Sequence, residues 1–127
     1  MPQVRQRHSG QPNPRAVLTK AALRAAEQLG VNARTLAATI GVSEATLSRM
    51  KHGDHLLESG TKPFELAVLF VRMFRSLDAI VGGDINVARA WLANTNTALD
   101  AKPIEKIRTV SGLTDVIAYL DARRAIA

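Results

Sequence analysis

The sequence predicts an all-α protein in which an N-terminal helix-turn-helix packs with a small C-terminal helical domain through a long central helix. Three observations support this fold class. Apolar residues recur at intervals of three and four, and no segment shows the alternation that predicts a β-strand. Helix-capping residues and glycines stand at nearly every expected helix boundary. Aromatic residues make up only 4% of the 127-residue chain, so the core must be aliphatic, which suits closely packed helices.

The N-terminal residues predict a flexible arm that precedes the first helix. We expect a disordered basic arm at 1–12, a helix-turn-helix domain at 13–60, and a unit with the central helix at 61–127. The arm is polar and rich in Gln, which predicts disorder. Arg5, Arg7 and Arg15 could lie along DNA phosphates, or the arm could be a solvated tail without a role. Because the arm has no apolar run, we expect no signal peptide. The lack of cysteine is compatible with a reducing cytoplasm, where we expect the protein to lie.

Three short helices are expected within 13–60. Their apolar residues follow helical spacing, and each helix has a start signal and a stop signal. The start signals are Asn13-Pro14, Asn32 and Ser43, and the stop signals are Gly30, Gly41 and Gly53. A polar connector then leads to the central helix, and the lone pair Leu56-Leu57 could attach this connector to the core.

The second and third helices have the spacing of a helix-turn-helix. Gly41 supplies the positive φ that a tight turn requires, and Ala37 is small where the next helix crosses it. The inward residues at this spacing are Leu36, Ala37, Ile40, Val42, Leu47 and Met50. The alternative is a helical corner without a role in DNA binding.

If this unit binds DNA, residues 43–52 lie in the major groove. Arg49 is the strongest candidate for base recognition, because a guanidinium can bond to both acceptors of guanine. Glu44 could accept a hydrogen bond from cytosine, or it could simply complement the helix dipole. Arg34 could clamp a phosphate. The predicted DNA-binding residues are Arg34, Ser43, Glu44, Ala45, Thr46, Ser48, Arg49 and Lys51.

The net charge of +6 is concentrated in the first half of the chain. Residues 1–62 hold nine Lys or Arg and four Asp or Glu, a net +5, whereas residues 63–127 hold eight and seven, a net +1. This asymmetry indicates a polyanion, such as nucleic acid, as a partner for the first half only, although a basic surface also serves solubility. One helix-turn-helix makes few base contacts, so we expect a homodimer, with the strongly apolar helix at 63–81 as its interface.

Further helices are expected in 61–127. Apolar residues cover well over half the circumference of the helix at 63–81, so it should be buried or form an interface. Beyond it, Asp84 caps a helix that runs to Leu92, and Pro103 starts a short helix that Ser111-Gly112 break. Thr114 then caps a last helix, whose inward residues are Val116, Ile117 and Leu120. Trp91 is expected in the core, and Asn94 and Asn96 are expected to shape a loop.

Two stretches of this second half resemble a known family. They are "ARAWLANTNTAL" at 88–99 and "KPIEKIRTVSGLTDVIAYL" at 102–120. With the upstream helix-turn-helix at 33–52, they resemble Xre/MbcA/ParS-type antitoxins. The resemblance implies an antitoxin of a type II toxin–antitoxin system. Such a protein covers the active site of a RES-domain toxin, which degrades NAD or performs ADP-ribosylation, and it represses its own operon at operator DNA.

The resemblance also implies that the C-terminal domain makes the inhibitory contacts. On this chain that domain corresponds to 88–127, and above all to the last helix. The implied toxin-binding residues are Leu120, Arg123, Arg124, Ile126 and Ala127. The two arginines could pair with carboxylates of the toxin, or they could compensate the dipole at the end of their helix.

Other function classes find little support in the sequence. The chain has no cysteine, and its three histidines lack metal-ligand spacing, so we expect no metal, no cofactor and no enzyme activity. The longest apolar run, "LAVLFV", is too short to span a membrane. Two alternatives stay open: a plain helix-turn-helix repressor whose C-terminal helices only dimerise or bind an effector, and an interaction module that has lost DNA binding.

Overall fold

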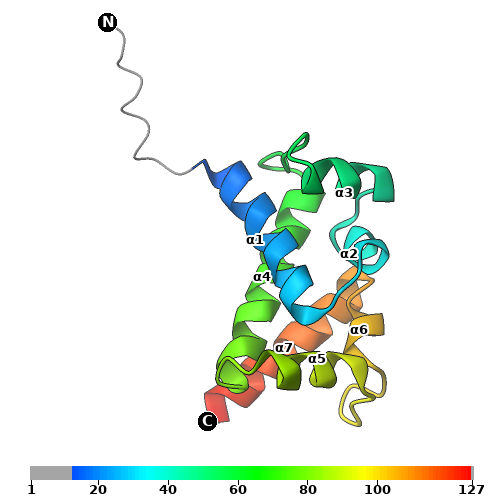
Figure 1. The fold of residues 1–127 in the computed structure, drawn as a ribbon. Coiled ribbons are helices and arrows are strands. Elements are labelled where there is room, and N and C mark those ends of the chain that lie inside the picture. Colours follow the sequence, from blue (N-terminus) through cyan, green and yellow to red (C-terminus); the bar gives the residue numbers. More distant parts are fainter. Residues whose placement is uncertain (1–12, 127) are drawn as a thin grey trace, which may run out of the picture.

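The structure is a computed structural model that describes residues 13–126, so the arm predicted at 1–12 and the predicted toxin contact Ala127 lie outside the described residues. Within that range the chain forms seven α-helices and no β-strand, which confirms the all-α fold class (Figure 1). The helices are α1 (Pro14–Leu29), α2 (Ala33–Ile40), α3 (Glu44–Lys51), α4 (Lys62–Ile80), α5 (Ile85–Ala93), α6 (Pro103–Lys106) and α7 (Val110–Ile126).

Helix α4 is the central element of the fold. It packs against α1, α2, α5 and α7, and it runs from the end of the molecule that holds α3 to the end where α7 finishes (Figure 1). Phe70, Met73 and Leu77 on α4 are at most 1% exposed. The long central helix was therefore predicted correctly, whereas its use as a dimer interface stays a prediction. Most of its apolar side chains form the core of a single chain.

Local capping interactions begin the first three helices as predicted. The side chain of Asn13 accepts a hydrogen bond from Arg15 N at 2.9 Å, and that of Asn32 accepts from Thr35 N at 2.8 Å. Gly30 ends α1 at a φ of 70°. Helix α4 begins one residue earlier than expected, because Thr61 caps it and Pro63 lies in its first turn.

The connector between α3 and α4 is anchored on α1. Leu57 is 1% exposed, and its N–H donates to Thr19 Oγ1 at 3.0 Å. Nearby, the guanidinium of Arg15 forms an ion pair with Glu58 at 2.6 Å. Arg15 thus lies in α1 and pairs within the fold, and its contact with DNA phosphates stays a prediction.

The break predicted at Ser111-Gly112 is wrong, because both residues lie inside α7. The chain leaves the helix earlier, at Ile107–Thr109. The hydroxyl of Thr109 accepts a hydrogen bond from Gly112 N at 3.1 Å, as the capping residue of a new helix does. The predicted cap, Thr114, instead donates its hydroxyl to Ser111 O at 2.9 Å within the helix. Gly112 is present because the backbone of α6 passes too close for a side chain.

Candidate functional site

The turn between α2 and α3 has the geometry of a helix-turn-helix. Gly41 adopts a φ of 76°, where a side chain would be strained, and only three residues separate α2 from α3. Ser43 then caps α3 by accepting from Thr46 N at 3.0 Å. Leu47 and Met50 are at most 3% exposed and seat α3 on the core. The opposite face of α3 is therefore free to meet a partner.

The outward face of α3 carries most of the predicted DNA-binding residues. Ser43, Glu44, Ala45, Ser48 and Arg49 are exposed, and Thr46 is half-buried. Helical spacing places Ala45, Ser48 and Arg49 opposite the buried Leu47 and Met50. A helix presenting small and polar side chains around one arginine can enter a major groove without steric obstruction.

A local hydrogen-bond chain orients Arg49. The Arg49 Nη2 atom donates to Thr46 Oγ1 at 3.0 Å, and the Ser43 hydroxyl donates to the same oxygen at 3.1 Å. The hydrogen bond from Arg49 places the guanidinium along the helix surface, beside Thr46. Preorganisation of this kind reduces the entropy lost when the side chain binds.

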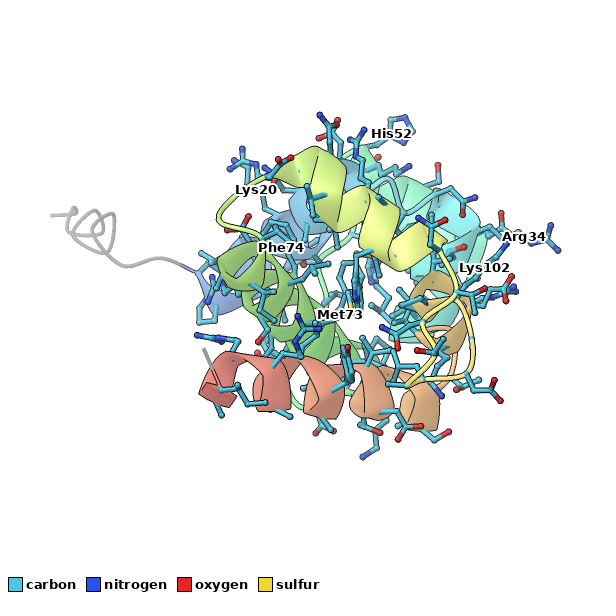
Figure 2. All side chains as sticks on the ribbon, turned by 90° about the horizontal axis from the view of Figure 1, so that it is seen from below. Lys20, Arg34, His52, Met73, Phe74 and Lys102 are labelled. Atoms are coloured by element: carbon cyan, nitrogen blue, oxygen red, sulfur yellow. The ribbon has the colours of Figure 1, made fainter. Side chains whose placement is uncertain are left out.

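The other predicted DNA contacts lie around this face. Glu44 occupies the first turn of α3, where its carboxylate complements the helix dipole. Arg34 lies on the exposed side of α2, and Figure 2 shows its side chain pointing away from the body of the molecule. Lys51 lies toward α1, where it lines a hollow with Lys20 and Arg24. Lys51 is therefore separated from the outward centre of α3.

The implied toxin-binding residues differ in their exposure to solvent. Leu120 is only 1% exposed and packs in the core, so its side chain cannot meet a partner in this conformation, which corrects that prediction. Ile126 is 83% exposed. Arg123, Arg124 and Ile126 surround a hollow at the end of α7 together with Ala79 and Ile80 of α4. Three of the predicted residues are thus brought together at one surface.

An aromatic pair lies beside this surface. Trp91 of α5 stacks on Tyr119 of α7, with ring centroids 6.0 Å apart, and Trp91 is half-buried rather than in the core as expected. Arg123 Nη1 donates to the Tyr119 hydroxyl at 2.9 Å. Hydrogen bonds from the side chains of Asn96 and Arg123 lower the pKa of Tyr119. Trp, Tyr and Arg are the residue types enriched in binding hot spots.

On the other side of α7, a polar cluster joins α7 to α4. Arg72 pairs with Asp121 at 2.5 Å, and the buried Ser76 hydroxyl donates to Asp121 Oδ1 at 3.3 Å. Arg124 Nη1 donates to Ser76 Oγ at 3.1 Å. This cluster and the Tyr119 stack were missed in the sequence, because their members lie on helices far apart along the chain. The two loop-shaping asparagines were predicted correctly, since Asn94 and Asn96 each bond to nearby backbone.

No group of three or more His, Asp or Glu among residues 13–126 is arranged to hold a metal ion. Over the same range, no helix has both the length and the hydrophobicity that a membrane span needs.

Comparisons with known families agree with this geometry. Residues 9–72 match the family described as the antitoxin Xre-like helix-turn-helix domain. Residues 76–125 match the family described as the antitoxin Xre/MbcA/ParS C-terminal toxin-binding domain. A search of curated proteins found no significant match.

Proposed function

Because the chain belongs to the family of antitoxins with an Xre-like helix-turn-helix domain and also carries an Xre/MbcA/ParS toxin-binding domain, we propose that it neutralises a RES-domain toxin and represses its own operon. The observation that carries the DNA-binding part is the exposed face of α3, on which Thr46 orients Arg49. The observation that carries the toxin-binding part is the exposed end of α7 within the toxin-binding domain.

In this proposal α3 enters the major groove of the operator. Arg49 bonds to a guanine, Ser48 meets a base or a phosphate, and Arg34 clamps the backbone from α2. Glu44 stabilises α3 through the helix dipole and can accept from a cytosine amino group. A homodimer places two copies of α3 on half-sites about 34 Å apart, which one helix-turn-helix needs for useful affinity.

The toxin-binding domain covers the active-site cleft of the toxin in this proposal. Arg123 and Arg124 can form bidentate ion pairs with toxin carboxylates, because a guanidinium matches the geometry of a carboxylate. Ile126 supplies an apolar contact beside them. The substrate of such a toxin is NAD, either for degradation or for ADP-ribosylation of a host enzyme.

Co-expression with the product of the neighbouring reading frame tests the toxin-binding part. We expect that product to be toxic alone, to co-purify with this chain, and to consume NAD only when this chain is absent. A neighbour that is harmless alone and does not co-purify would leave the chain as a plain repressor or an interaction module.

Operator binding tests the DNA-binding part. We expect the affinity to fall steeply with salt concentration, as phosphate contacts require. Arg49→Ala should weaken cognate binding by about 1–3 kcal/mol, because one bidentate base contact is lost. Arg108→Ala, an exposed arginine between α6 and α7, is the matched control and should bind normally. Equal affinities for both variants would argue against α3 as the reading helix.

A further inference from the structure

An open groove of about 840 Å³ runs between α1, α4 and α7. Its floor is aliphatic and includes Val17 of α1 and Val68 of α4, which are 53% and 44% exposed. These two valines are exposed although they lie on helices that supply much of the core. A contiguous apolar surface of this kind, with polar groups along its rim, is typical of an interaction site.

The rim of this groove is strongly basic. A second hollow of about 320 Å³ shares Val17, Ala21, Val71 and Arg75 with it and continues along α1. Figure 2 shows Lys20 and Phe74, which line this second hollow, on the same side of the molecule. The cationic residues that line the two hollows are Lys20, Arg24, Arg72, Arg75 and Arg124. The single carboxylate among the lining residues, Asp121, is already paired with Arg72.

Charge decides which occupant fits this basic apolar groove. The arm at 1–12 holds two arginines and no carboxylate, so it would be repelled. A second copy docked groove to groove would bring arginines of one copy against arginines of the other. DNA would satisfy the cations but would leave the aliphatic floor without an apolar partner. An amphipathic polypeptide segment with aliphatic and acidic side chains satisfies both features.

We propose that the groove between α1, α4 and α7 docks an acidic amphipathic segment of the toxin, which rests on the toxin-binding function proposed above. Aliphatic side chains of that segment lie on Val17 and Val68, and its carboxylates pair with Arg75 and Arg124. The toxin interface thereby extends beyond the end of α7 onto α1 and α4. Since α1 belongs to the half of the chain that carries α3, the bound toxin also contacts the DNA-binding half.

Two substitutions in the full-length chain test this surface, with the purified toxin encoded beside it as the probe. Arg75→Glu reverses one exposed rim charge, and Val68→Asp places a carboxylate on the floor. We expect each to raise the Kd for the toxin about 30-fold, as loss of a hot-spot contact does. The controls Lys62→Glu and Ala38→Asp introduce the same carboxylates at exposed positions outside the groove and outside residues 76–125, and they should leave the Kd unchanged. Circular dichroism and thermal unfolding verify that all four variants fold.

Four other results would each contradict the groove proposal, and each has a different meaning. If both groove variants bind the toxin like the unmodified chain, the groove is not the docking surface, although the antitoxin function stands. If the unmodified chain itself does not bind the toxin, the proposed function fails and the groove proposal fails with it. If the variants change only the mass of the toxin-free protein in analytical ultracentrifugation, the groove joins two copies. If they weaken only operator binding, its occupant is DNA.

Discussion

Replacing Gly112 with alanine should destabilise this protein, although alanine is the better helix former. Gly112 is a buried residue in the first turn of α7. A Cβ atom built there would lie 1.9 Å from the carbonyl oxygen of Lys106 and 2.7 Å from its carbonyl carbon. Both are backbone atoms of α6, so they cannot rotate away as the end of a flexible side chain could.

The magnitude follows from two opposing contributions. In an unobstructed helix, glycine to alanine would stabilise by about 1 kcal/mol. Here α6 and α7 must move apart by about 1.5 Å to reach an ordinary contact distance, which disturbs the junction around Ile107, a residue with 0% exposure. Overpacking of this kind costs about 3 kcal/mol at the upper end of the usual range. We therefore expect a net loss of about 2 kcal/mol in the free energy of unfolding.

Urea unfolding, followed by circular dichroism, measures this loss. The midpoint should fall while the dependence on urea concentration stays the same. Ser111→Ala is the matched control, because its side chain is exposed in the same turn and the change only improves helix propensity. A Gly112→Ala variant as stable as the unmodified protein would show that α6 and α7 do not approach as closely as described, and the reasoning would be refuted.

Three further predictions test the aromatic pair, the core and the helix cap. Tyr119 is the only tyrosine, so absorbance titration should give a pKa below the ordinary tyrosine value, and Arg123→Ala should raise it. Because the pKa of Tyr119 is lower in the folded state, the ionised phenol stabilises the fold as the pH rises through that pKa, and this stabilisation is lost as the pH falls. A titration at the ordinary tyrosine pKa would contradict this. Met73→Ala should cost about 2–5 kcal/mol in urea unfolding, since Met73 is 0% exposed, and a loss near zero would place it outside the core. Ser43→Ala should cost about 1 kcal/mol by the same measurement, and no loss would mean that its hydroxyl does not cap α3.

The helix-turn-helix could be predicted almost residue by residue. Asn32 and Ser43 were identified as caps and Gly41 as the turn glycine, and the structure confirms all three. These features depend on contacts between residues three or four apart, so the local sequence contains the information. The helix break predicted at Ser111-Gly112 was wrong because it depends on a contact between two helices, which the local sequence does not contain. Glycine is the usual sign of a helix end, but here it allows α6 to pass close to α7.

The surfaces that meet a partner depend on contacts that no local pattern reveals. The pairing of Arg72 with Asp121 joins residues 49 positions apart, and the stack of Trp91 on Tyr119 joins two different helices. The apolar helix at 63–81 could be buried or form an interface, and only its position between α1 and α7 decides that most of it is core.

The sequence by itself determined the all-α class, the order of the helices and the basic first half of this antitoxin. Helical periodicity and capping act within one turn, and charge depends on composition alone. The tertiary structure alone decided that Leu120 is buried, that Val68 stays exposed, and that basic side chains of α4 and α7 surround one apolar groove. The physical reason is that burial and charge pairing are properties of helices brought together in space.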